Sequence, residues 1–498
     1  MNSPSFFSFQ RFFTRKNLLI LLALVLLARV TDMLLLPVYD PSEARYAAIC
    51  SNMAVRNNFL EPQFVHQGTL QNFEGKPPLY FQLGGIFCKL FGVNEFSVRL
   101  PALLAALGIL AVLFFTVKKL RSERTAVIAA LVCGIEPVFL IFCGFCMTDL
   151  LLCLAITGAV CAYTLFSAAE KIPEKKLWSC GFFVALAVGM IVKGPVALVL
   201  AGMPVFLFVL IGNRWRELKH HAWIAGTFLF LLICLPWYLL MRMKNPDFLE
   251  YFFVNENFKR FLFKEYGDRY GAGRETFRGM ALVWFIACNL FCLIAALFPR
   301  FFGKKIFPRT KEEYRNILTD PLTGPALLTV VTNVLFWCLT SRVLVTYLLP
   351  TIPAGAVLAA ELLERCAPAE ESRWNRLPAV WFSGATVFCA AGLLYLGLFP
   401  LKVEAGGGHF FRKVADAPEN RGMQVYFLRK TPLSAEFYLR ERVVNHPDES
   451  REESLARSSR CLLFIPDSQL RKLKTPPENR KRIARGGKWN VYAPAEER

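Results

Sequence analysis

A short segment after the first apolar stretch gathers side chains that can act in catalysis. Asp40 and Glu43 supply two carboxylates, and Arg45 and Tyr46 follow directly. A charged side chain beside hydrocarbon loses hydration, so such a cluster needs partner groups, water or a charged substrate to compensate it. A carboxylate can act as a general base, and a guanidinium can bind phosphate oxygens in pairs. The segment therefore indicates chemistry on a substrate with a polar head and a lipid tail.

Three carboxylates are the candidate catalytic groups. Glu43 and Asp149 are predicted to act as the base and its positioning partner, and Asp40 is a third candidate. A lone carboxylate in a loop is usually a solvated surface charge. Asp149 is harder to explain in that way, because it stands at the margin of an apolar stretch, where a charge is costly. The sequence leaves open which carboxylate is the base.

Basic and aromatic residues near the ends of other apolar stretches are candidate ligands for a phosphate. Arginine suits bidentate contacts to phosphate oxygens, and lysine acts as a point charge. The alternative is that these side chains reach toward lipid headgroups, which is least convincing for Lys193 because apolar residues flank it on both sides. The predicted substrate-binding residues are Arg45, Tyr46, Lys76, Lys193, Arg260, Arg269, Arg342 and Tyr347.

Composition fixes the class of protein. The 498 residues are 55% hydrophobic and 19% charged, with a mean hydropathy of +0.39, which is more apolar surface than a soluble fold can bury. We expect an all-α polytopic membrane protein with eleven transmembrane helices of roughly 20 residues each. The expected spans lie near residues 17–36, 97–117, 125–143, 149–168, 177–192, 195–211, 222–241, 279–299, 321–340, 344–363 and 377–400.

Charge patterning predicts the orientation and the domains. Lysine and arginine are concentrated in alternate loops, which places the amino terminus in the cytoplasm and the carboxyl terminus outside. Residues 1–400 would form the membrane domain, with outer loops at 37–96 and 242–278. In the first loop, an amphipathic helix at Arg45–Asn57 and an apolar helix at Leu79–Phe91 would lie along the interface, and the aromatic and charged second loop would rest on the membrane surface. Residues 401–498 change in composition after a glycine run and are predicted to form a small soluble α/β domain in the periplasm.

The remaining composition excludes several classes. The formal charge of +20 is explained by basic residues that flank the membrane and can contact anionic lipid headgroups. The sequence contains no nucleic-acid-binding motif, so nucleic-acid binding is not expected. Most of the fifteen cysteines lie in expected spans, where apolar packing is their ordinary role, so a disulfide-stapled domain is not expected. The five histidines are scattered. We expect no cofactor, because a monophosphate leaving group met by protein cations does not need a divalent cation.

Several motifs, in a fixed order, resemble those of the GT-C glycosyltransferases that use polyprenyl-phosphate sugars, a family that includes the protein O-mannosyltransferases and the lipid A aminoarabinose transferases. The matching segments are residues 40–47, 75–79, 90–101, 147–149, 192–195, 245–248, 256–261, 341–342 and 347–350. The resemblance covers about residues 15 to 360. It implies a membrane-embedded transferase in which acidic residues of the first outer loop and of a later span flank the reacting centre. It also implies that the basic candidates hold the lipid phosphate. The chain departs from the aminoarabinose-transferase pattern at Ser42, where an aspartate commonly stands.

The expected function is inverting transfer of a sugar from polyprenyl (undecaprenyl) phosphate to an acceptor on the periplasmic side of a bacterial inner membrane. Lipid A or another envelope glycan is the expected acceptor. A protein hydroxyl, as in the mannosyltransferases, and a flippase of lipid-linked sugars are the alternatives, although a flippase usually shows paired repeats and broken helices at the midplane. The expected partners are therefore the lipid-linked donor, the acceptor and membrane lipids, and the protein is expected to act as a monomer.

Overall fold

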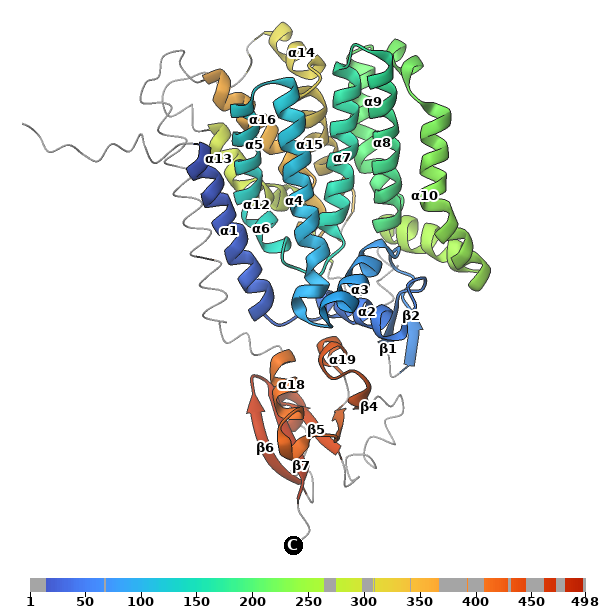
Figure 1. Ribbon diagram of the computed structural model, residues 1–498, viewed down its shortest axis with the longest axis vertical. Coiled ribbons are helices and arrows are strands. Elements are labelled where there is room, and N and C mark those ends of the chain that lie inside the picture. Colours follow the sequence, from blue (N-terminus) through green and yellow to red (C-terminus); the bar gives the residue numbers. More distant parts are fainter. Residues whose placement is uncertain are drawn as a thin grey trace, which may run out of the picture.

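A computed structural model describes residues 15–66, 69–263, 275–297, 308, 310–340, 342–366, 392, 407–428, 431–444, 461–471 and 480–495. A bundle of long helices forms one part of the molecule, and short helices and a sheet form the other (Figure 1). The helices of the bundle are α1 (Arg15–Leu35), α4 (Glu95–Leu120), α5 (Glu123–Ile135), α6 (Pro137–Phe142), α7 (Asp149–Ala168), α8 (Ile172–Lys193), α9 (Val196–Ile211), α10 (Trp223–Lys244), α12 (Met280–Cys288), α13 (Leu290–Leu297), α14 (Lys311–Thr319), α15 (Thr323–Cys338) and α16 (Thr351–Cys366).

The bundle is that of a multi-pass membrane protein. Among the described residues, α4, α7, α8 and α10 are long and apolar enough to cross a bilayer, and two bent pairs, α12 with α13 and α14 with α15, raise the number to six. Every expected span up to residue 363 coincides with a helix or with consecutive helices. The last, at 377–400, lies outside the described residues, so the total of eleven stays a prediction.

Local sequence explains where key helices begin and end. The side chain of Asn94 accepts the backbone N–H of Ser97 at the start of α4, and Ser122 caps α5 in the same way. Helix α8 ends at Lys193 because Gly194 follows with a φ of +89°, which a residue with a Cβ rarely adopts. α7 and α8 form an antiparallel pair, so the first residue of α7 and the last residue of α8 lie at the same end of the bundle.

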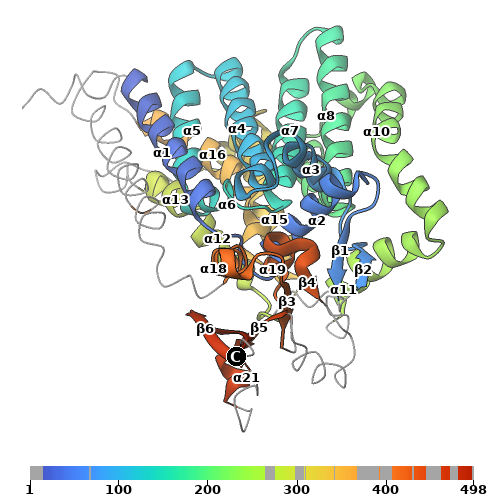
Figure 2. The same cartoon turned by 60° about the horizontal axis from the view of Figure 1, so that its bottom comes forward.

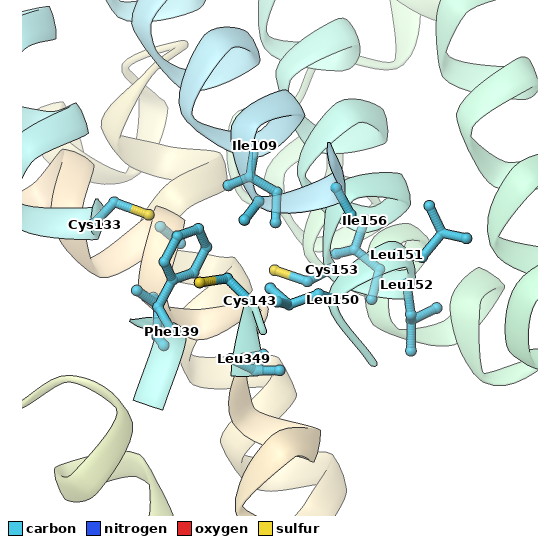
Figure 3. Packing of buried hydrophobic residues seen from close by; sticks show 14 of the residues in the cluster. Ile109, Cys133, Phe139, Cys143, Leu150, Leu151, Leu152, Cys153, Ile156 and Leu349 are labelled. Carbon is cyan, nitrogen blue, oxygen red and sulfur yellow. The ribbon is translucent and has the colours of Figure 1, made fainter. Parts of the chain in front are cut away.

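The centre of the bundle is filled by small and branched apolar side chains. Ile109 of α4, Phe139 of α6, Leu150 and Ile156 of α7 and Leu349 pack together with several cysteines (Figure 3). The cysteines that the structure describes are free thiols, and most of them are buried. They therefore serve as apolar filler, as the sequence predicts.

Two helices and a hairpin cover one end of the bundle. α2 (Ser42–Arg56) and α3 (Leu79–Phe91) lie beside the antiparallel strands β1 (Gln63–His66) and β2 (Thr69–Asn72), as Figures 1 and 2 show. The sequence predicts helices at Arg45–Asn57 and Leu79–Phe91, and both are confirmed. On the other side of the same end, the second outer loop forms a π-helix, η3 (Glu250–Lys259), which continues into α11 (Arg260–Leu262).

The carboxyl-terminal part is a small α/β unit. Its sheet has the strand order β4-β3-β5-β7-β6, in which β3 (Gln424–Phe427) is parallel to β4 (Val443–Val444) and β5 (Cys461–Pro466), whereas β7 (Trp489–Pro494) is antiparallel to β5 and β6 (Arg480–Gly486). α18 (Gly408–Ala415) packs on this sheet through Phe411. The predicted α/β character is confirmed, and the apolar runs of the sequence at Gln424–Leu428, Cys461–Ile465 and Trp489–Tyr492 form β3, β5 and β7. The boundary near residue 401 lies outside the described residues and stays a prediction.

Helix α19 (Leu433–Leu439) joins this unit to the covered end of the bundle. The hydroxyl of Tyr438 donates to Oε1 of Glu95 at 2.7 Å and accepts the backbone N–H of Val38 at 3.0 Å. The backbone N–H of Ser434 donates to Oδ1 of Asp40 at 3.0 Å. The α/β unit therefore lies at the end of the bundle that carries α2 (Figure 2).

Candidate active site

A polar pocket lies between the elements gathered at this end of the bundle, and its empty space, including the part open to solvent, is about 470 Å³. It receives side chains from α2, the turn before α3, the start of α7, the end of α8, η3, α11 and η5 (Val345–Leu348). Its lining consists of Ser42, Arg45, Tyr46, Phe73, Lys76, Met147, Thr148, Asp149, Lys193, Glu256, Arg260, Leu344 and Tyr347. Four basic side chains face two acidic ones, an excess of two positive charges. The pocket is suited to an anion.

Asp149 and Lys193 form an ion pair on one wall of the pocket. Nζ of Lys193 donates to Oδ1 of Asp149 at 2.7 Å and lies 4.2 Å from the centre of the Tyr347 ring. Both side chains are less than one-tenth exposed. The other oxygen of Asp149 has no hydrogen-bond partner among the described residues. This oxygen can accept a proton from a substrate hydroxyl while Lys193 holds the carboxylate in place.

Lys76, Glu256 and Arg260 form a second charged group in the pocket. Nζ of Lys76 lies 2.8 Å from Oε1 of Glu256, and a guanidinium nitrogen of Arg260 contacts the same oxygen. Glu256 belongs to η3, and π-helical turns often occur at functional sites. The Cζ atom of Phe252 in η3 would lie only 2.7 Å from a Cβ at Gly194. Glycine beside Lys193 therefore allows η3 to pack against the end of α8 and to present Glu256 to the pocket.

Arg45 and Tyr46 reach the pocket from the first turn of α2. The guanidinium of Arg45 lies 5.3 Å from the ring centre of Phe73, and Tyr46 packs edge-on against Phe81. Both side chains are almost completely buried. The aromatic contacts fix the direction in which the guanidinium points.

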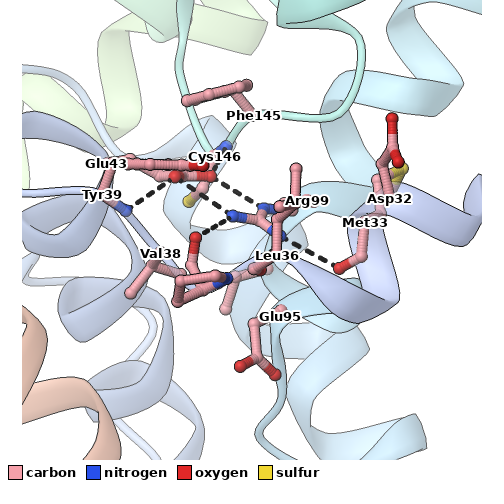
Figure 4. Close-up of polar contacts among 12 residues, drawn as sticks. Asp32, Met33, Leu36, Val38, Tyr39, Glu43, Glu95, Arg99, Phe145 and Cys146 are labelled. Carbon is pink, nitrogen blue, oxygen red and sulfur yellow. Dashed lines mark hydrogen bonds and ion pairs between the residues drawn. The ribbon is translucent and has the colours of Figure 1, made fainter. Parts of the chain in front are cut away.

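Glu43, in contrast, does not line the pocket, and its carboxylate faces Arg99 (Figure 4). Its carboxylate pairs with Nε of Arg99 at 2.8 Å and accepts the backbone N–H groups of Tyr39 at 2.9 Å and Cys146 at 3.0 Å. Arg99 in turn donates to the carbonyl groups of Met33, Leu36 and Pro37. The predicted role of Glu43 as the base therefore lacks the geometric support that Asp149 has. Its contacts instead connect α2 to the segment that leads into Asp149.

Asp40 also lies away from the pocket. Both of its oxygens contact Ser434 of α19, one through the backbone N–H and the other through the hydroxyl at 2.5 Å. Burial raises the pKa of Asp40, while these hydrogen bonds oppose the shift. The structure thus places Asp40 in the contact with the α/β unit and not among the pocket residues.

Some of the other predicted substrate-binding residues line the pocket, and others do not. The structure brings Lys76, Lys193, Arg260 and Tyr347 together in the pocket. Arg342 lies outside its lining and contacts Glu275 at 3.4 Å, and Arg269 lies outside the described residues. Sequence reasoning missed Glu256, although this residue begins one of the family-like motifs. Its proximity to Arg260 in that motif was the available signal.

Two further features of the pocket bear on its chemistry. The hydroxyl of Thr148 is buried and has no hydrogen-bond partner among the described residues, so it can contact a bound sugar or phosphate. The described residues contain no cluster of histidine, cysteine or carboxylate side chains that could hold a metal ion. The expectation that no metal is required stays untested.

Comparisons with known proteins agree with the motifs. Residues 14–252 match the family model for dolichyl-phosphate-mannose-protein mannosyltransferases. The undecaprenyl phosphate-alpha-4-amino-4-deoxy-L-arabinose arabinosyl transferases of Edwardsiella ictaluri and Serratia proteamaculans are 30% identical over 226 residues and 27% identical over 384 residues. These matches include 45% and 76% of this chain, and 40% and 64% of the respective relatives.

The fold has a counterpart among solved structures. The crystal structure of ArnT from Cupriavidus metallidurans bound to undecaprenyl phosphate matches with a TM-score of 0.77 and 18% identity, over 95% of this chain and 97% of that one. Residues 14–252 of this chain are thus similar to the mannosyltransferase family model, and the chain has the fold of the ArnT structure, in agreement with the family resemblance of its sequence motifs.

Proposed function

We propose that this protein transfers a sugar from a polyprenyl phosphate donor to an acceptor at the outer face of a bacterial inner membrane. The observation that carries the proposal is the pocket, in which four cations face two carboxylates at the edge of an apolar bundle. A donor of this class has a phosphodiester head and an isoprenoid tail. Its head fits the excess positive charge of the pocket, and its tail can remain in the lipid beside the bundle.

The cations would stabilise the departing phosphate. During transfer the bond between the anomeric carbon and the phosphate oxygen breaks, so that negative charge develops on the leaving group. Lys76 and Arg260 contact the same Glu256 oxygen in the pocket lining, and Arg45 and Lys193 complete the basic lining. Fixed cations in a pocket shielded from water stabilise such developing charge without reorganisation.

Asp149 is the group best placed to act as the base. The acceptor hydroxyl would give its proton to the free oxygen of Asp149 and attack the anomeric carbon from the face opposite the phosphate. The configuration at that carbon would be inverted. Lys193 would position Asp149 through their ion pair. Glu43 would contribute by holding the backbone of the segment that precedes Asp149.

Undecaprenyl phosphate and 4-amino-4-deoxy-L-arabinose are the donor components named for the curated relatives. We extend the donor class to this chain and propose an envelope glycan such as lipid A as the acceptor. A protein hydroxyl is the second candidate, because the matching family model is that of protein mannosyltransferases. A flippase remains the third alternative, and it would move the donor across the membrane unchanged.

The charge pattern supports a periplasmic site. The loops expected in the cytoplasm are enriched in lysine and arginine, and the pocket lies at the opposite end of α4, α7 and α8 from those loops. The α/β unit, which contacts α2 through α19, would then also be periplasmic.

The test is transfer by the purified protein in detergent. Undecaprenyl-phosphate-linked sugar carrying a label is incubated with lipid A, with an envelope glycan fraction or with a peptide rich in serine and threonine. The proposal predicts a labelled acceptor and release of undecaprenyl phosphate, both dependent on Asp149. Recovery of the donor unchanged with every acceptor, although it binds, would contradict the proposal. The acceptor that takes the label distinguishes a glycolipid transferase from a protein transferase.

A further inference from the structure

The two cations on one wall of the pocket already hold an anion of the protein itself. Lys76 and Arg260 contact the same oxygen, Oε1 of Glu256. The side chain of Glu256 is 5% exposed, and those of Lys76 and Arg260 are 16% and 19% exposed. A phosphate that binds these cations must therefore share them with Glu256 or displace it.

The surroundings make displacement of the side chain easier than displacement of the helix. The backbone of η3 is fixed by the packing of Phe252 against Gly194 and by a hydrogen bond from the side chain of Asn257 to the carbonyl of Phe252. The carboxylate of a glutamate, in contrast, can turn to another staggered rotamer without moving the backbone. An unpaired buried charge is costly, so Glu256 is expected to remain with the cations whenever no other anion is present.

The charge state of Lys76 depends on this partner. Burial lowers the pKa of Lys76, and the neighbouring Glu256 carboxylate opposes that shift. The ammonium group thus needs an anion beside it in the empty pocket as well as in the occupied one. Glu256 and a lipid phosphate would meet that need in turn.

We propose that Glu256 is a returning counter-ion, which leaves Lys76 and Arg260 when the lipid phosphate binds and promotes release of the product when it returns. This inference rests on the proposed function and specifies how the same site turns over. The donor is a phosphodiester with one negative charge. The product, polyprenyl phosphate, is a monoester that carries more negative charge and would bind the cations more strongly than the donor does. A competing carboxylate in the protein offsets that difference.

The experiment compares Glu256→Gln with Glu250→Gln in the otherwise intact protein. Glu250 is exposed on the same π-helix and is not in the pocket, so it is a matched control for the loss of one charge. Binding of undecaprenyl phosphate is measured in detergent by titration calorimetry, and product inhibition is measured in the transfer assay. Glu256→Gln should bind undecaprenyl phosphate about tenfold tighter and be inhibited more strongly by it, because a competing charge is removed from two buried cations.

Glu250→Gln should behave like the unchanged protein in both measurements. Equal or weaker binding of undecaprenyl phosphate by a folded Glu256→Gln protein would overturn the inference, because Glu256 would then support the cations and not compete for them. If Glu256→Gln does not fold, Glu256→Asp carries the test, since the shorter side chain should compete less and give an intermediate gain in affinity. Failure of the unchanged protein to bind undecaprenyl phosphate would instead refute the proposed function itself.

Discussion

Two buried ion pairs at the same end of the bundle have similar compositions and different surroundings. Glu43 with Arg99 and Asp149 with Lys193 each join the first turn of one helix to a cation on another. Both oxygens of Glu43 are occupied by the arginine and by backbone N–H groups, whereas Asp149 keeps one oxygen free beside the pocket. Glu43, whose oxygens are all bonded within the protein, therefore stabilises the fold. Asp149, with one oxygen still able to accept a hydrogen bond, is available to a substrate.

The largest effect is expected on turnover, from a change in the pair of Asp149 and Lys193. Asp149→Asn removes the proposed base while keeping its size, so turnover should fall by about 10²- to 10⁴-fold. Binding of undecaprenyl phosphate should change little, whereas thermal stability should fall, because Lys193 loses its buried charge partner. Turnover is measured as transfer of labelled sugar. The control is Asp247→Asn, a change at an exposed residue of the second outer loop. Near-normal transfer by Asp149→Asn would remove this residue from the mechanism.

A change in the pair of Glu43 and Arg99 should mainly lower the stability of the protein. Glu43→Gln leaves the guanidinium of Arg99, which is about 1% exposed, without its charge partner, and breaking a buried pair in this way costs about 3–5 kcal/mol. Thermal unfolding in detergent should therefore shift well below that of the unchanged protein. Replacing both partners, with Glu43→Gln and Arg99→Gln, should cost less than the sum of the single changes. A stable Glu43→Gln protein that has lost turnover would reverse the roles assigned to the two carboxylates.

A pH profile separates Lys76 from the arginines of the pocket. Because burial lowers the pKa of Lys76 from its ordinary value of 10.5, its positive charge is lost earlier as the pH rises. Binding of undecaprenyl phosphate favours the protonated form, so affinity should decline on the alkaline side below pH 10.5. Lys76→Arg keeps its charge throughout and should flatten the decline. An identical profile in the two proteins would show that Lys76 does not contact the phosphate.

The smallest expected effect concerns the contact between α19 and the covered end of the bundle. Oε1 of Glu436 accepts the backbone N–H of Val65 at 2.5 Å, and burial raises the pKa of Glu436 from 4.5 to about 7. A raised pKa in the docked state means that docking is strongest below about pH 4.5 and weakens as the pH rises through 7. Hydrogen exchange of α19 should accelerate over this interval. Glu436→Gln should remove the pH dependence, and an unchanged dependence in that variant would assign it to another group.

Much of this arrangement was predictable because it depends on local patterns. The apolar stretches predict the helices of the bundle, and an antiparallel pair that starts at Asp149 and ends at Lys193 must bring those two residues to one end. The pairing of Glu43 with Arg99 was not predictable. Arg99 lies in a family-like motif at the start of α4, but only the packing of α1, α2 and α4 shows that it closes around a carboxylate instead of facing a substrate.

The role of Glu256 could not be predicted from the sequence. In the sequence it is one carboxylate in a loop of mixed aromatic and charged residues, which is the usual pattern of a membrane-surface segment. Its role depends on the π-helical turn and on Gly194, which together bring it to Lys76 from a distant part of the chain. Neither feature leaves a periodic signal in the sequence.

The most direct test of the central claim is a cryo-electron microscopy structure of the protein with undecaprenyl phosphate bound. Phosphate oxygens should contact Lys76 and Arg260, the Glu256 carboxylate should be turned away from both cations, and Asp149 should still be paired with Lys193 beside the phosphate. A phosphate bound elsewhere on the protein, with Lys76, Glu256 and Arg260 still joined, would contradict it.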